Sequence, residues 1–191
     1  MNLLPLDPPW FIGHAAGHRS LLTARERRVV WQLAFFIITG YAIELPWLLS
    51  SAELPRLENL WGEFWALYGQ ADRGYYDQVS SFERGLESFH IFVTQWLYVW
   101  LLWAVTRRWA YRHVLQIAVG SYVAFSTVVY LVAKHLTGYA LMPEHELPNF
   151  LILYLANLPW VFGNLYIAVD GARELVRLIA AARLVHARQA R

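Results

Sequence analysis

Two glutamates lie inside apolar segments of this chain that are each long enough to cross a bilayer. Glu44 lies in VVWQLAFFIITGYAIELPWLLS, and Glu87 lies at the head of LESFHIFVTQWLYVWLLWAV. An ionisable side chain at membrane depth costs about 2.5–3.5 kcal/mol on insertion scales, so such a group is by default a candidate for function. Both carboxyls are therefore our first candidates for chemistry.

Two carboxyls in one apolar cavity can hold a single proton at neutral pH, which supplies a general acid and a general base. Aromatic faces stabilise cations, and aromatic residues make up 16% of the chain. An acid, a base and aromatic walls suit protonation of an alkene, a shielded carbocation and loss of a different proton. The same groups suit passive binding of a hydrophobic amine or a sterol, so that alternative stays open.

Other polar residues recur at helical spacing within apolar segments. His90 follows Glu87 by three residues. Asn157, Trp160 and Asn164 lie at positions i, i+3 and i+7 of a helix. Because lipid cannot satisfy hydrogen bonds, we expect these stripes to face the interior of a bundle. A lone buried His or Asn more often links helices than catalyses a reaction, whereas two buried carboxyls with no Lys or Arg at their depth are harder to explain that way.

Four apolar segments must position these residues. They cover roughly residues 29–50, 86–106, 113–133 and 149–169. Each is about 20 residues long, the length at which a helix crosses about 30 Å of hydrocarbon. The sequence predicts an all-α membrane protein, a four-transmembrane-helix bundle whose polar side chains converge in the outer half of the bilayer.

The loop after the first segment carries a further helical pattern. Apolar and aromatic residues recur there at helical spacing: Leu57, Leu60, Trp61, Phe64, Trp65 and Tyr68. Because aromatic rings favour the membrane interface, this pattern predicts an outer-side amphipathic helix. Pro46 predicts a kink near the outer end of the first segment. Glu83 is expected to be solvated at the start of the second segment.

The distribution of basic residues indicates an orientation. Twelve of the 16 Lys and Arg residues flank the segments on one side, which predicts that both termini are cytoplasmic. We divide the chain into an N-terminal segment (1–28), the bundle (29–172) and a basic tail (173–191). The tail is expected to follow a fourth span ending near Asp170 and to lie along the inner membrane surface. The membrane would be the endoplasmic reticulum in a eukaryote or the cytoplasmic membrane in a bacterium.

Composition excludes or disfavours several kinds of site. The chain has no cysteine, so thiolate catalysis and zinc–thiolate sites are excluded. Glu144, His145 and Glu146 could ligate a metal, but a solvated loop explains them better, and no metal site is predicted. The basic clusters lack interleaved aromatic residues, so nucleic-acid binding is not predicted.

Taken together, these residues resemble the emopamil-binding protein family, the sterol Δ8–Δ7 isomerases of the EXPERA group, which also holds the sigma-two receptor. The resemblance covers about residues 38–172. Its main matches are Glu44 in IELPW, Glu87, and an Asn-x-x-Trp motif at Asn157 and Trp160. Further matches are Trp65, Tyr68, Asp72, Tyr75, Leu115, Gln116, Tyr130 and Asp170.

The resemblance implies a bundle of four or five helices around a sterol-sized cavity, in which acidic residues move a proton across a sterol double bond without a cofactor. Cationic amphiphilic amines would bind by mimicking the carbocation. The chain departs from the family pattern where Gly40 replaces a His one turn before the first Glu, and where Thr127 replaces an Asp. We hypothesise that His90 supplies the lost imidazole from another helix.

The sequence thus favours a cofactor-independent double-bond isomerase of a sterol or related polycyclic terpenoid. Glu44 and Glu87 are the candidate proton donor and acceptor, in an order left open, with Asn157 holding one carboxyl and His90 assisting. The candidate substrate-binding residues are Tyr41, Trp47, Thr127, Tyr130, Trp160 and Asn164. Two alternatives remain, namely a proton-initiated isomerase or cyclase of another isoprenoid, and a non-catalytic sterol-binding or trafficking protein. The expected partners are a hydrophobic small molecule and membrane lipid, and a homodimer is left open.

Overall fold

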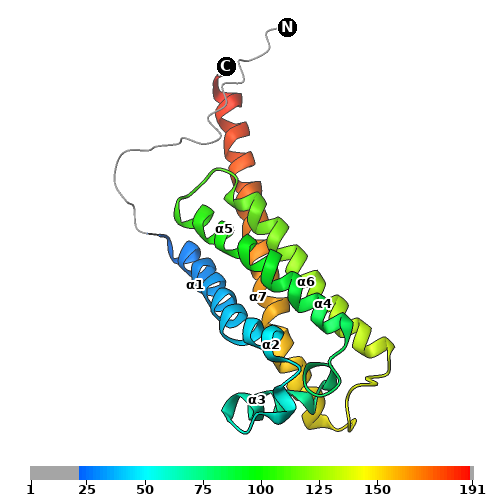
Figure 1. The fold of residues 1–191 in the computed structure, drawn as a ribbon. Helices are drawn as coiled ribbons and strands as arrows, with labels where there is room; N and C mark the ends of the chain where they lie inside the picture. Colours follow the sequence, from blue (N-terminus) through cyan, green and yellow to red (C-terminus); the bar gives the residue numbers. More distant parts are fainter. Residues whose placement is uncertain (1–21, 190–191) are drawn as a thin grey trace.

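Four long helices form an elongated bundle in the computed structural model, which describes residues 22–189 (Figure 1). The first joins α1 (Ala24–Thr39), a π-helical turn (Gly40–Glu44) and α2 (Leu45–Ser50). The second joins α4 (Ser81–Phe89), a π-helical turn (His90–Thr94) and α5 (Gln95–Thr106). The third and fourth are α6 (Arg112–Leu136) and α7 (Leu147–Gln189).

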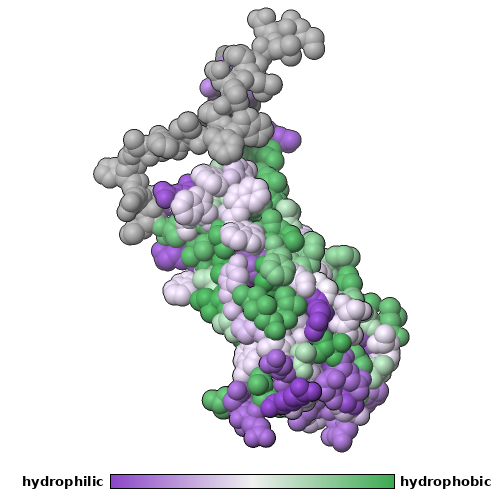
Figure 2. All heavy atoms as spheres, viewed as in Figure 1, coloured by the Kyte–Doolittle hydropathy of each residue, from purple (hydrophilic) through white to green (hydrophobic). Residues whose placement is uncertain are grey.

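Each of these four helices is long and apolar enough to cross a membrane, so within the described residues the predicted all-α, four-span fold is confirmed. Hydrophobic residues cover the middle of the bundle, and hydrophilic residues gather over its lower end (Figure 2). The apolar middle of the bundle can therefore face the hydrocarbon of a lipid bilayer. The chain is thus a multi-pass membrane protein, while the predicted position of its termini stays a prediction.

The predicted amphipathic helix is α3 (Leu60–Gly69), which lies across the end of the bundle away from the last turns of α7 (Figure 1). The side chain of Asn59 caps it by accepting from the backbone N–H groups of Trp61 and Gly62. Trp65 is buried, whereas Leu60 stays 84% exposed. One face of α3 therefore packs on the bundle and the other faces outward. Short 3₁₀ turns at Leu54–Arg56 and Arg73–Tyr75 flank this helix.

The interface between α6 and α7 is close because a glycine lies in it. A Cβ atom at Gly120 would lie 2.6 Å from the backbone oxygen of Asn164 on α7. Small residues allow this kind of backbone approach between membrane helices. The hydrophobic core beside it includes Leu33, Tyr98, Val123 and Ile167, so all four spans meet there.

A buried ionic cluster closes the α3 end of the bundle. The ammonium of Lys134 lies 2.6 Å from Asp72 Oδ2 and also forms an ion pair with Glu83. The hydroxyl of Tyr130 donates to Asp72 at 2.6 Å. Glu83 is 2% exposed, so the expectation that it is solvated was wrong. The sequence around Glu83 does not show that its cationic partner, Lys134, comes from another helix.

The helix that carries the fourth span does not end near Asp170, because α7 continues through Pro159 and Asp170 to Gln189. Where the membrane-crossing part of α7 ends stays a prediction. The last turns of α7 project along the bundle axis beyond the other helices (Figure 1). The expected contact of the tail with the inner membrane surface stays a prediction. Asp170 forms an ion pair with Arg25 of α1. The division of the chain at 28 and 172 stays a prediction, and most of the segment 1–28 lies outside the described residues.

Candidate active site

The two glutamates line one cavity of about 70 Å³ in the half of the bundle nearer α3. All four long helices contribute to it, together with Tyr75 from the segment before α4. The lining residues are Glu44, Tyr75, Leu86, Glu87, His90, Tyr122, Ser126, Thr127, Tyr130, Asn157 and Trp160. Acidic, imidazole, hydroxyl and aromatic groups thus share one small space.

Two π-helical turns pack against each other beside this cavity. Glu44 ends the first turn and His90 begins the second. In each turn a backbone N–H donates to the carbonyl five residues earlier, from Leu45 to Gly40 and from Gln95 to His90. Such turns are rare and frequently occur at functional sites. Pro46 comes directly after the first turn, at the start of α2. The kink that we predicted near Pro46 stays a prediction.

Glu44 has one carboxyl oxygen without a hydrogen bond. Its Oε2 atom is buried and lies 3.3 Å from Nε2 of His90, the nearest ionisable partner that the structure gives it. An ionised carboxylate buried without hydrogen bonds is very costly, whereas a neutral carboxylic acid costs far less. This environment therefore fits a protonated Glu44.

Glu87 has a different environment, because its Oε1 atom accepts a hydrogen bond from the hydroxyl of Tyr75 at 2.7 Å. Burial, and then the charge of Glu87, raise the pKa of Tyr75, so this hydroxyl stays a neutral donor. The indole of Trp47 donates to the backbone oxygen of Tyr75 at 2.8 Å and packs on its ring at 4.9 Å. A fixed hydroxyl donor stabilises the ionised form of a carboxyl. This environment therefore fits a carboxylate at Glu87.

His90 is held by Gln95, whose Nε2 atom lies 2.9 Å from Nε2 of the imidazole. The same amide nitrogen lies 3.4 Å from the backbone oxygen of Phe36, which orients it as the donor. The imidazole Nε2 is then an acceptor, so its proton is on Nδ1. Trp160 packs edge-on against the ring at 4.9 Å. A Glu44 carboxyl can approach this acceptor favourably only as an acid.

Gly40 leaves the space that the side chain of Gln95 occupies beside His90. A Cβ atom there would lie 1.9 Å from Nε2 of Gln95, so any larger residue would occupy the space of the amide. Gln95 is fully buried between the first and second spans. The position where the chain departs from the family pattern is therefore filled by a side chain from the neighbouring helix, and that side chain holds the imidazole of His90.

Seven of the ten residues predicted for the site line the cavity. They are Glu44, Glu87, His90, Thr127, Tyr130, Asn157 and Trp160. The amide of Asn157 donates to the backbone oxygen of Leu153 at 2.8 Å and to the hydroxyl of Tyr68 at 3.2 Å, and not to a carboxyl as we expected. The catalytic and binding roles assigned to these residues stay predictions.

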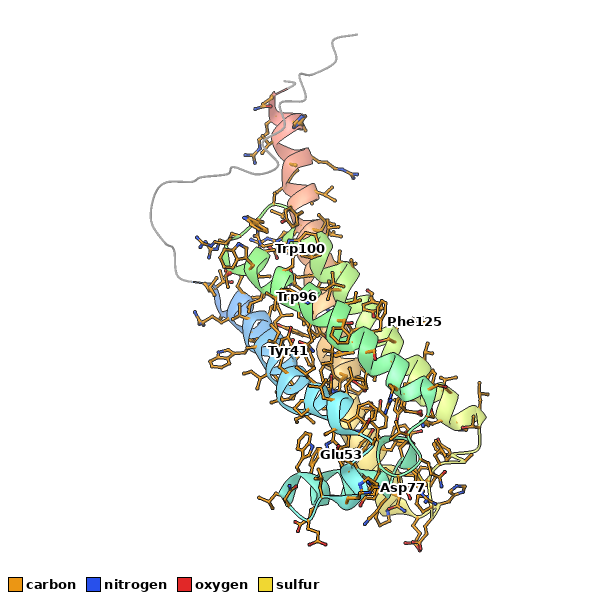
Figure 3. All side chains as sticks on the ribbon, in the orientation of Figure 1. Tyr41, Glu53, Asp77, Trp96, Trp100 and Phe125 are labelled. Atoms are coloured by element: carbon orange, nitrogen blue, oxygen red, sulfur yellow. The ribbon has the colours of Figure 1, made fainter. Side chains whose placement is uncertain are left out.

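The other three predicted residues lie elsewhere. Tyr41, labelled in Figure 3, is 38% exposed on the first span. Trp47 is fully buried against Trp65, with ring centroids 5.9 Å apart. Asn164 is fully buried and accepts from the hydroxyl of Tyr98 at 2.8 Å. The π-helical turn shifts the helical register of the first span by one residue, and the α-helical pattern did not include this shift.

Sequence reasoning missed Gln95 and Tyr122. Gln95 is the one glutamine in the second apolar segment, and its polar type at membrane depth was a usable signal. Tyr122 lines the cavity and its hydroxyl lies 3.2 Å from Oγ1 of Thr94, but nothing marks it among 11 tyrosines. Arg84, the arginine nearest to Glu87 in the sequence, donates to the hydroxyl of Ser51.

Comparison with known families gives one match. The model of the family described as EXPERA (EXPanded EBP superfamily) matches residues 60–171, which is more than half of the chain. The matched region includes Glu87, Asn157 and Trp160, and it begins after Glu44. That family includes isomerases. No curated protein matches the chain.

Proposed function

The chain belongs to the EXPERA family, and we propose that it is a cofactor-independent double-bond isomerase of a sterol or a related polycyclic terpenoid. One observation carries this proposal. Two carboxyls line the same cavity in opposite hydrogen-bonding states, because Glu44 Oε2 has no hydrogen-bond partner while Glu87 accepts from Tyr75. A pair in which one member holds the proton can act as an acid and a base.

The proposed order of steps follows from these states. Glu44 donates its proton to one alkene carbon, and the electron pair of the double bond forms the new C–H bond. The adjacent carbon becomes a carbocation, which the faces of Trp160, Tyr122 and Tyr130 stabilise. Glu87 then removes a proton from a neighbouring carbon, and that C–H electron pair forms the shifted double bond. Glu87 then releases its proton to water and Glu44 takes up a proton from water before the next turnover, so the proton that Glu44 delivers comes from the solvent.

The size of the cavity bears on the substrate. About 70 Å³ is smaller than the roughly 300–1,000 Å³ of pockets that enclose a drug-sized ligand. A polycyclic substrate therefore enters only when the lining side chains or helices separate. The small volume also supports a second candidate, in which the same acid and base act on a smaller isoprenoid.

The experiment uses purified protein, a Δ8 sterol and deuterated water. We expect a shifted-alkene product that carries one deuterium per molecule at the protonated carbon. E44Q and E87Q should each abolish turnover, whereas E53Q, which changes an exposed glutamate at the α3 end (Figure 3), should not. An unchanged sterol that nevertheless raises the thermal stability of the protein would replace our proposal with a non-catalytic binding protein. Turnover of a smaller isoprenoid alone would select the second candidate.

We propose that cationic amphiphilic amines inhibit the reaction. A protonated amine carries the charge that the carbocation would carry, and the cavity offers the carboxylate of Glu87 and the ring of Trp160 to it. Competitive inhibition by a tertiary amine, weakened in E87Q when binding is measured directly, would support this. Equal affinity for the wild-type protein and E87Q would contradict it.

A further inference from the structure

A second cavity, of about 440 Å³, lies at the opposite end of the bundle from α3. It is formed by the start of α1, the end of α5, the start of α6 and the middle of α7. It shares no lining residue with the candidate active site. Its volume is within the range of pockets that bind small molecules.

Among the described residues, the charged side chains that line this cavity are four arginines, three carboxylates and a histidine. Arg25 forms ion pairs with Asp170 and Glu174. Arg108 lies 3.0 Å from Glu26. Arg177 also lies 3.4 Å from Glu174. Among the described residues that line the cavity, and with the histidine neutral, the arginines outnumber the carboxylates by one, which favours an anion.

Arg112 is an arginine of this cavity whose positive charge is not balanced by an ion pair among the described residues. Its Nη1 atom donates to the backbone oxygens of Arg108 and Trp109, both at 3.1 Å. Its Nε atom is buried without a hydrogen bond, and no carboxylate of the described chain forms an ion pair with it. A guanidinium presents a planar set of donors that matches a phosphate. The free side of Arg112 is therefore suited to a phosphate oxygen.

His113 adds a second unsatisfied group. It is 6% exposed and lines the cavity, and its Nε2 atom has no hydrogen-bond partner. Its Nδ1 atom lies 2.8 Å from Oε1 of Gln116, whose amide nitrogen is turned toward Asp170 Oδ2 at 3.3 Å. Nδ1 is thus the donor and Nε2 is an acceptor for a hydroxyl of a ligand.

The depth of the cavity along the bundle indicates where the ligand comes from. Aromatic side chains surround this end of α5 and α6, as they do where proteins meet lipid headgroups. Trp103 packs on Arg107 at 4.8 Å, and the indole of Trp100 (Figure 3) donates to the hydroxyl of Tyr111 at 3.3 Å. All three of these aromatic residues are exposed on the bundle. The cavity is therefore at headgroup level, where basic pockets between membrane helices bind anionic lipids.

We propose that this cavity binds the phosphate ester of an anionic phospholipid headgroup. The phosphate occupies the free side of Arg112, and a headgroup hydroxyl donates to Nε2 of His113. The ion pairs of Arg25 and Arg108 hold α1, α6 and α7 around it. This site is independent of the isomerase proposal, because its ligand is not a substrate and its residues lie outside the first cavity.

The test measures thermal unfolding of delipidated full-length protein in detergent. The additions are short-chain phosphatidylglycerol, short-chain phosphatidylcholine, or inorganic phosphate at matched ionic strength. We expect phosphatidylglycerol to raise the unfolding temperature of the wild-type protein more than phosphatidylcholine does. R112Q should lose this difference, whereas R183Q, which changes an exposed arginine of α7 outside the cavity, should keep it. If R112Q does not fold, H113A replaces it and should likewise lose the difference between the two lipids.

The outcomes separate the sources of the phosphate. An effect of phosphatidylglycerol alone, lost in R112Q or H113A, supports the lipid. An equal effect of inorganic phosphate with the same loss keeps the site but assigns it to a free phosphate, which overturns the lipid assignment. No effect of either anion, or equal loss in R183Q, overturns the proposal altogether, because attraction would then come from the charge of the whole basic end.

Discussion

Replacement of Gly40 by alanine tests how the site is assembled. The new Cβ atom would lie 1.9 Å from Nε2 and 2.5 Å from Cδ of Gln95, so the buried amide must move. Overpacking a buried site costs about 1–3 kcal/mol, against a gain of about 1 kcal/mol from replacing glycine in a helix. Loss of the hydrogen bond to His90, worth about 1 kcal/mol, corresponds to about a fivefold lower rate if His90 holds Glu44 in place.

Gly85 of α4 offers a matched control, because a Cβ atom there meets nothing within 4 Å. G85A should be stabilised only by the higher helix propensity of alanine. The difference in unfolding temperature between G40A and G85A therefore reports the contact with Gln95. The assays are thermal unfolding in detergent and sterol turnover. G40A should unfold at a lower temperature than G85A and turn over more slowly, and G40A/Q95A should recover stability because the clash is removed.

Two results would refute this reasoning. If G40A equalled G85A in both assays, Gln95 would not be confined by Gly40. If G40A lost stability but kept full turnover, the contact between Gln95 and His90 would be structural and would have no part in the reaction.

Two further substitutions test the hydrogen bond to the proposed base and the buried ionic cluster. Y75F should lower turnover about 10- to 100-fold, because a hydrogen bond to a charged group is worth about 1.5–3 kcal/mol; Y76F is the control, and equal rates would remove Tyr75 from the mechanism. K134M should lower the free energy of unfolding by about 3–5 kcal/mol, because it leaves two buried carboxylates without their cation. The control is R73Q, which removes an exposed ion pair with Asp77 that solvent screens, and it should change denaturant unfolding little. Equal losses in the two variants would contradict our view of the cluster.

The sequence was sufficient to predict the four spans and the meeting of Glu44, Glu87 and Asn157, because span length and helical period carry that information. A polar side chain on a membrane-spanning helix can satisfy its hydrogen bonds only inside the bundle, because lipid offers none. Its depth is fixed by 1.5 Å per residue, so residues at similar distances from the helix ends converge. The fold class and the neighbourhood of the site follow from these two facts.

The details that escaped prediction arise from backbone departures and from partners far apart in sequence. Tyr41 and Trp47 were assigned to the site as aromatic residues near Glu44 in the sequence. Tyr41 instead lies in the π-helical turn and is 38% exposed, and Trp47 packs against Trp65. Glu83 was assigned to solvent because its partner, Lys134, lies 51 residues away on α6. The ion pair of Asp170 joins it to Arg25, which lies 145 residues away on α1. A local pattern contains none of these contacts.

The two π-helical turns also give this bundle an unusual tolerance of length. One residue added to an ordinary α-helix turns everything beyond it by about 100°, which would rotate a whole span against its neighbours. A π-helical turn absorbs that residue locally. The turns at Gly40–Glu44 and His90–Thr94 are therefore the two places, among the described residues, where deletion of one residue would restore an ordinary α-helical turn, reshape the reacting groups and leave the packing of the spans in register. New substrate preferences could be engineered there by changing chain length instead of side chains.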